Sequence, residues 1–119
     1  MQLRPHVELT FTRGPALSPP DALRAWLEQQ GDRTVRLPVT LVLEAPHRIA
    51  SARVGELPVT LDDSALGISL VDRLRQACPG QGECRVRLEG RWGPDFRVLH
   101  FVGPVAEGAP ADFAEVAAP

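Results

Sequence analysis

The chain has 119 residues, of which 13 are basic and 15 acidic, and its formal net charge is −2. This length fits a single domain with a hydrophobic core of its own, and the acidic balance disfavours the broad basic surface of a general nucleic-acid-binding protein. No apolar run approaches the roughly 20 residues of a transmembrane helix, and the N-terminal residues lack the apolar segment of a secretory signal peptide.

The basic residues are all arginine, and the chain contains no lysine, asparagine or tyrosine. The codons of those three amino acids are AT-rich, so the composition indicates a bacterial gene of high GC content. The arginine enrichment is therefore weak evidence for phosphate recognition.

The first half of the chain predicts one strand, one helix and then three strands. Residues His6–Thr12 alternate as a strand does, and Ser18 is expected to cap a helix that ends at Gly31. The three following strands are predicted at Thr34–Glu44, Arg48–Val54 and Leu57–Leu61. Pro38 lies inside the first of them and lacks the N–H that a ladder needs, so we expect that strand to lie at a sheet edge or to be bulged there.

The second half predicts a helix and two strands. Ser69 and Asp72 form a capping box at the start of a helix that reaches about Cys78. Strands are predicted at Cys84–Trp92 and Phe96–Val102. Residues 1–103 are expected to form one α+β domain. Residues 104–119, which are rich in alanine and proline, are expected to form a tail that lies on the surface or is flexible.

The order of elements from Thr34 to Val102 is three strands, a helix and two strands. This order resembles the oligonucleotide/oligosaccharide-binding (OB) fold, a small five-stranded barrel with a helix between its third and fourth strands. The resemblance rests on the order of elements alone and covers residues 34–102. It implies an OB-like barrel extended by the N-terminal strand and helix. A ferredoxin-like α+β sandwich is the alternative fold.

Both cysteines lie in the sequence CPGQGEC, residues 78–84. The spacing is not that of a zinc site, which needs further ligands, nor that of a Cys-x-x-Cys redox motif. Phosphate-binding loops lead from a strand into a helix, whereas this segment leads from a helix into a strand. Pro79 and Gly80 fit the centre of a type II turn, which predicts a Cys78–Cys84 disulfide. Two free buried thiols are the alternative.

The outward positions of the strand after the cysteines carry an arginine row. Arg85, Arg87 and Arg91 share one face, and Arg97 lies on the neighbouring strand. Such a row is a candidate binding surface for an anionic strand, but its face carries no aromatic side chain for base stacking. A solvated sheet face is the alternative interpretation.

The last strand is apolar on both faces. Its alternation predicts that His100 is half-buried beside apolar neighbours, and that Leu99 and Phe101 share the opposite face. Without a covering element, Leu99 and Phe101 would form an exposed patch for a protein partner.

The pair Asp62 and Asp63, followed by Ser64, is the densest polar cluster. These carboxylates are weak candidates for a metal ion or a general base, and acidic residues before a helix more often serve as capping groups. We predict no catalytic residue, no metal site and no cofactor.

These patterns favour a non-enzymatic module of the bacterial envelope, or a secreted one, that binds another protein or itself. If the cysteines are oxidised and a signal has been removed, the chain is extracytoplasmic; otherwise it is cytoplasmic. The alternatives are a cytoplasmic OB-type binder of single-stranded nucleic acid, and an enzyme that uses the Asp62/Asp63 loop.

Overall fold

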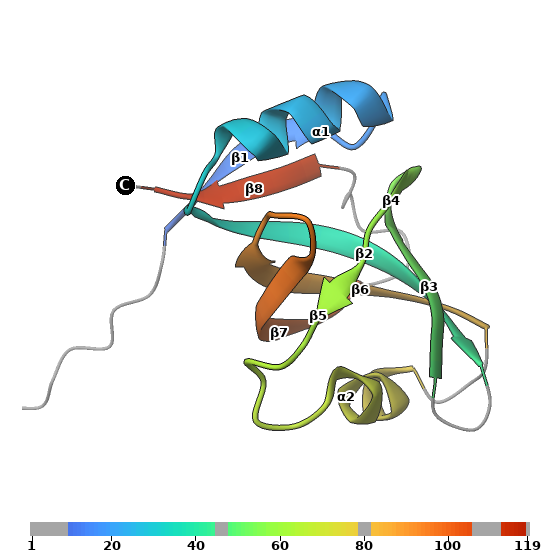
Figure 1. Ribbon diagram of the computed structural model, residues 1–119. Helices are drawn as coiled ribbons and strands as arrows, with labels where there is room; N and C mark the ends of the chain where they lie inside the picture. Colours follow the sequence, from blue (N-terminus) through green and yellow to red (C-terminus); the bar gives the residue numbers. More distant parts are fainter. Residues whose placement is uncertain (1–9, 45–47, 79–81, 106–112, 119) are drawn as a thin grey trace, which may run out of the picture.

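A computed structural model describes residues 10–44, 48–78, 82–105 and 113–118. It contains one mixed β-sheet and two short helices (Figure 1). The elements in chain order are β1 (Phe11–Ala16), α1 (Pro20–Gln29), β2 (Thr34–Glu44), β3 (Arg48–Val54), β4 (Leu57–Pro58), β5 (Leu61–Asp62), α2 (Leu70–Ala77), β6 (Gly82–Arg91), β7 (Phe96–Pro104) and β8 (Phe113–Ala117).

The strands of the main sheet follow the order β1-β8-β2-β6-β7-β5, and β3 branches off to pair with β2 and β4. All of these pairs are antiparallel except β5 with β7. Helix α1 contacts β1 and β4, and α2 contacts β7 at the other end of the molecule (Figure 1). The predicted α+β class is confirmed. The ladders form an open sheet that ends at β1 and β5, not a closed barrel.

Strand β2 lies at the centre of the sheet. It pairs with β6 from Thr34 to Leu43, while its other edge pairs with β8 at residues 35–36 and with β3 at residues 40–44. Pro38 falls in the gap between these two partners. The strand is therefore not an edge strand, but its proline occupies a stretch that is paired on one side only, where a missing N–H is tolerated.

The core lies between the sheet and the two helices. Its fully buried side chains come mainly from alternate positions of β2 and β6, as expected for strands with one buried face. They include Val35, Leu37, Val39, Leu41, Val86 and Leu88, together with Leu23 and Leu27 of α1 and Leu70 and Leu74 of α2. Trp26 packs against this cluster.

The two helices begin differently. In α2, Ser69 is the N-cap residue, and its Oγ accepts a hydrogen bond of 3.3 Å from the backbone N–H of Asp72. In α1 the N-cap residue is Pro19, and no side chain caps the helix. The predicted cap at Ser18 is thus wrong, because the helix begins one residue later than a Ser18 cap requires.

The predicted third strand, Leu57–Leu61, divides into β4 and β5. The N–H of Val59 still donates to Ala52 in β3, but the carbonyl of Thr60 already accepts from Phe96 in β7. The backbone of this segment therefore changes its hydrogen-bonding partner from β3 to β7 between Val59 and Thr60.

Part of the predicted C-terminal tail forms a strand. Residues Phe113–Ala117 make β8, which lies between β1 and β2 and buries Ala114, Val116 and Ala117. The alternation of small apolar residues allows this segment to fit a sheet face. The predicted N-terminal strand, His6–Thr12, falls mostly outside the described residues, and β1 covers Phe11–Ala16.

Strand β7 carries two bulges. Leu99 and Val102 have no partner in the register with β6, and both side chains are exposed, at 37% and 40%. An extra residue reverses the faces of the residues that follow it. Phe101 therefore packs against the core, while His100 is exposed. The prediction of a half-buried His100 is wrong, and Leu99 and Phe101 do not form one patch.

Candidate functional site

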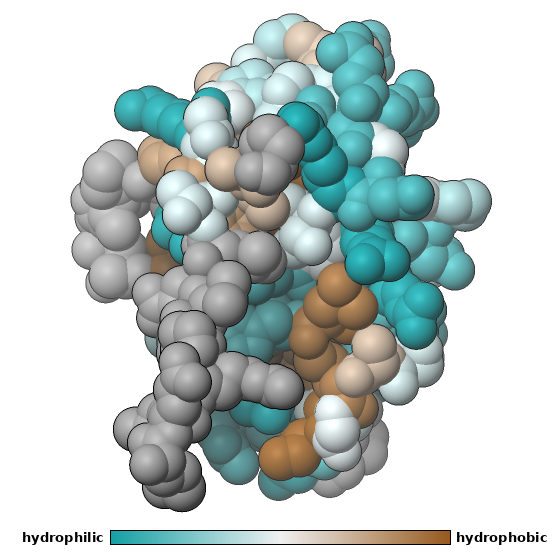
Figure 2. All heavy atoms as spheres, turned by 90° about the vertical axis from the view of Figure 1, so that its left-hand side faces the viewer, coloured by the Kyte–Doolittle hydropathy of each residue, from teal (hydrophilic) through white to brown (hydrophobic). Residues whose placement is uncertain are grey.

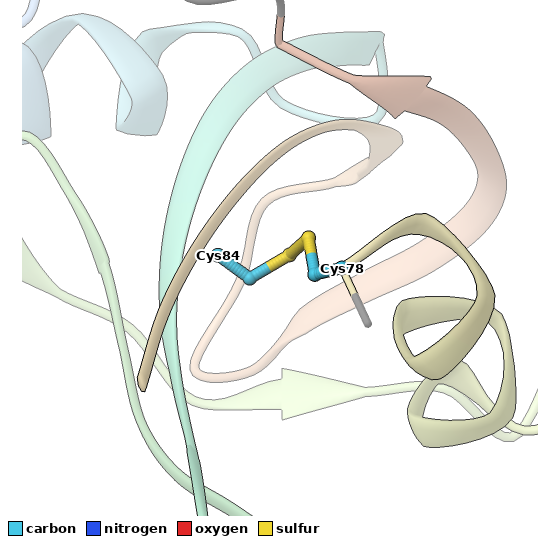
Figure 3. Close-up of a disulfide and its surroundings, with 2 residues drawn as sticks. All are labelled: Cys78 and Cys84. Atoms are coloured by element: carbon cyan, nitrogen blue, oxygen red, sulfur yellow. A yellow bond between two sulfur atoms is a disulfide. The ribbon is translucent and has the colours of Figure 1, made fainter. Parts of the chain in front are cut away.

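The disulfide predicted from the sequence is present. Cys78 is the C-cap residue of α2 and Cys84 lies in β6, with Cα atoms 5.9 Å apart (Figure 3). This separation is usual for a disulfide. Cys84 is 3% exposed and lies opposite Leu41 of β2. The bond ties α2 to the central strands. The predicted turn at Pro79-Gly80 lies outside the described residues.

The arginine row is part of a network of ion pairs on the outer sheet face. Arg87 pairs with Glu115 of β8 at 3.5 Å, and Arg36 of β2 pairs with Glu89 at 2.6 Å. The guanidinium of Arg36 also lies 4.0 Å from the centre of the Phe11 ring. Two of the arginine side chains on this sheet face therefore already interact with acidic or aromatic side chains of the protein.

The remaining members of the row lie at its ends. The side chains of Arg85, Arg91 and Arg97 are exposed. Arg91 and Arg97 are register partners on β6 and β7, and Arg97 lies close enough to Asp62 to act on the pKa of that carboxyl. The structure therefore does not bring the four arginines together as a continuous unpaired surface.

The Asp62/Asp63 loop uses its carboxylates to order the backbone. Asp62 Oδ1 accepts a hydrogen bond of 3.0 Å from the N–H of Ser64, and Asp63 Oδ2 accepts one of 2.9 Å from Leu70, the first residue of α2. The bond from Ser64, aided by Arg97, holds the pKa of Asp62 below its usual value. No group of three or more potential metal ligands occurs among the described residues.

Removing the Asp63 carboxylate is expected to destabilise the fold, because this group accepts a hydrogen bond from the backbone N–H of Leu70, the first residue of α2. The variant Asp63→Ala should lower the free energy of unfolding by about 1 kcal/mol, measured by urea denaturation. Asp32→Ala, at an exposed acidic residue with no side-chain hydrogen bond to a described residue, is the control and should change it little. An increase in the melting temperature of the native protein with Mg²⁺ or Ca²⁺ would contradict this assignment.

A cleft of about 560 Å³ lies where α1, the β4–β5 segment and the β6–β7 turn meet. We call it the Trp92 cleft. Its apolar lining includes Leu27, Pro58, Trp92, Pro94 and Phe96. Leu27 and Phe96 are almost fully buried. Trp92 is half-buried, packs against the core and has its ring centre 6.3 Å from that of Phe96.

Two charged residues of α1 contribute to the same cleft. Arg24 and Glu28 are one helical turn apart, and both side chains are exposed. Neither makes a side-chain hydrogen bond or ion pair with another described residue. Thr60 adds a further polar group. The cleft therefore combines an apolar surface with a few polar groups at its mouth, as small ligand sites generally do.

Exposed apolar side chains also occur away from the cleft. Among the described residues, the large ones are Ile68, Leu99 and Val102. Figure 2 shows apolar side chains gathered in the lower part of one face, beside hydrophilic ones. Exposed apolar residues are normal on protein surfaces, so these side chains are weaker evidence for a binding site than the cleft.

Comparison with known proteins finds no family model that matches this chain, and no curated protein or solved structure that is significantly similar to it. In the part of the chain that the structure describes, no helix has the length and apolar character needed to cross a membrane.

Sequence reasoning did not find the Trp92 cleft. Trp92 directly follows β6, has the parity of the buried residues of that strand and packs against the core. The sequence feature that could have indicated the cleft is the position of Trp92 at the end of the strand, directly before Gly93-Pro94. Residues at strand ends and turns often line clefts. The contribution of α1 depends on tertiary packing and has no signal in the local sequence.

Proposed function

We propose that this protein is a non-enzymatic binding module of the bacterial envelope, or a secreted one, and that the Trp92 cleft is its ligand site. The observation that carries the proposal is the cleft itself. It combines a half-buried tryptophan with an arginine and a glutamate that have no side-chain partner among the described residues. Its volume is within the range of roughly 300–1,000 Å³ that is usual for ligand sites.

The disulfide supports an extracytoplasmic location. Structural disulfides persist in the periplasm and outside the cell, whereas the cytosol of most bacteria keeps thiols reduced. A bond that ties α2 to β6 suits a small domain that must hold its shape without cellular quality control.

We further propose that residues 34–102 form an OB-like arrangement. The pairs β2–β3, β3–β4, β5–β7, β7–β6 and β6–β2 support it, because they connect the strands of these residues in one series that is open only between β4 and β5. In the sequence, helix α2 lies between the β4–β5 segment and β6, which corresponds to the position of the helix in the OB fold.

The alternative functions have less support. A single-stranded nucleic-acid binder would use Arg85, Arg87, Arg91 and Arg97, but the ion pair to Arg87 and the net negative charge of the chain weigh against it. An enzyme based on Asp62 and Asp63 would need carboxylates that are free to act, and both accept backbone hydrogen bonds.

The proposed site is tested by binding of small organic fragments, followed in ¹H–¹⁵N NMR spectra of the disulfide-bonded protein. We expect several fragments to shift the indole N–H signal of Trp92 and the amide signals of residues 24–31. The indole N–H signal of Trp26, whose side chain does not line the cleft, is the internal control. Hits that perturb residues elsewhere and leave the cleft unchanged would overturn the assignment.

A further inference from the structure

We infer that the Trp92 cleft binds an extended peptide segment of a partner protein, in which a proline or aromatic side chain packs against Trp92. This inference rests on the proposed function, because it names the ligand class of the same site. It is drawn from the chemistry of Arg24 and Glu28, from their spacing, and from the apolar lining of the same cleft.

The two charged groups match a ligand that both accepts and donates hydrogen bonds. A guanidinium only donates and a carboxylate only accepts. Arg24 and Glu28 lie in the same cleft without side-chain partners among the described residues. A small anion would be attracted by Arg24 and repelled by Glu28, and a small cation the reverse. A neutral peptide backbone offers a carbonyl to the first and an N–H to the second.

The spacing of the two residues fits an extended chain. Residues four apart on a helix are separated by about 6 Å along the axis, and the backbone groups on one edge of an extended peptide repeat every two residues, at about 6.6 Å. In a peptide that lies along α1, a backbone carbonyl of one residue can therefore reach Arg24, and the backbone N–H of a residue two positions away can reach Glu28. Neither side chain has to give up an existing ion pair.

The apolar lining provides the anchor. Trp92 packs against the core, and Pro58 and Pro94 belong to the lining of the same cleft. Large apolar side chains that enter such pockets usually supply most of the affinity of a peptide, and proline segments are favoured on aromatic surfaces because they lose little entropy on binding.

The test is selection of peptides from a random display library on the native disulfide-bonded protein, followed by calorimetric measurement of the dissociation constants of the selected peptides. We expect selected sequences to share a proline or aromatic position. Affinity should fall at least about tenfold in Trp92→Ala, and roughly fivefold in each of Arg24→Ala and Glu28→Ala. Arg33→Ala and Glu44→Ala replace exposed charges outside the cleft and should leave the affinity unchanged.

If Trp92→Ala fails to fold, the Arg24→Ala and Glu28→Ala variants still test the inference. Both side chains are exposed, so their removal should not unfold the protein. Selected peptides that bind the Arg24→Ala and Glu28→Ala variants as tightly as the native protein would overturn the inference. A set of neutral oligosaccharides and the fragments of the previous test are titrated in parallel. If these bind the cleft and the peptides do not, the peptide assignment fails and the binding function stands. If nothing binds the cleft, both fail.

Discussion

Replacement of Gly90 by alanine is expected to destabilise this protein by roughly 3 kcal/mol, the upper part of the range for overpacked cores. Gly90 is buried in β6 beside the first bulge of β7. A Cβ atom at this position would overlap the backbone carbonyl of Arg97 and lie 3.1 Å from the ring of Phe96. Backbone of a paired strand cannot move aside as a flexible side chain can, so β6 and β7 would have to separate locally.

The measurement is the free energy of unfolding from urea denaturation, with a decrease in melting temperature of roughly 10 °C as the thermal counterpart. Gly67→Ala is the matched control. A Cβ at Gly67 meets nothing within 4 Å, and the backbone there does not have the positive φ that favours glycine. This control should change the free energy by no more than about 0.5 kcal/mol. Equal stability of Gly90→Ala and the native protein would mean that the register of β6 and β7 is wrong.

Removal of the disulfide is expected to have the second largest effect. The double variant Cys78→Ala/Cys84→Ala should lose about 2.4 kcal/mol, the loop-entropy value for a closed ring of about seven residues. Alanine is chosen because Cys84 is buried and a serine hydroxyl there would need a hydrogen-bond partner. Because the bond anchors the end of α2, the helix should be the first element to lose protection against hydrogen exchange.

The matched comparison is the native protein with and without a reducing agent, which should reproduce the loss. Intact mass under non-reducing conditions should be two hydrogens lower than the reduced mass, and thiol-alkylating reagents should not react. Two reactive thiols in protein isolated from its native cell would contradict the oxidised state and remove the main support for an extracytoplasmic location. Unchanged stability on reduction would show that the packing of Leu70 and Leu74 and the hydrogen bonds at the start of α2 hold the helix without the disulfide.

Local chemistry explains which elements could be predicted. Strand β2 has the predicted bounds because its apolar residues alternate from Val35 to Leu43. Strand β3 has the predicted bounds because the turn at Gly55-Glu56 directly follows its last residue. The Ser69 cap and the Cys78–Cys84 disulfide also depend on residues at most six positions apart. In each case the interacting groups are close in the sequence, so their spacing carries the information.

Contacts between distant segments explain the differences. Composition suggested a surface tail, but Phe113–Ala117 becomes a strand because β1 and β2 offer it edges on both sides. The face of Phe101 could not be predicted, because the bulge at Leu99 exists only in relation to β6. By its parity Gly90 is an inward position of β6 like Val86 and Leu88, and only the approach of the Arg97 carbonyl makes glycine necessary there.

The sequence by itself determined the α+β composition of this protein, most of its strands, the cap of α2 and the disulfide, since hydrophobic period, turn residues and short loops act over a few residues. Only the tertiary structure decided which residue pairs with Arg87 of the arginine row and where a ligand can bind. Glu115 reaches Arg87 from the far end of the chain, and the Trp92 cleft unites α1, the β4–β5 segment and the β6–β7 turn. Both depend on the order of strands in the sheet, which long-range packing selects and no local pattern encodes.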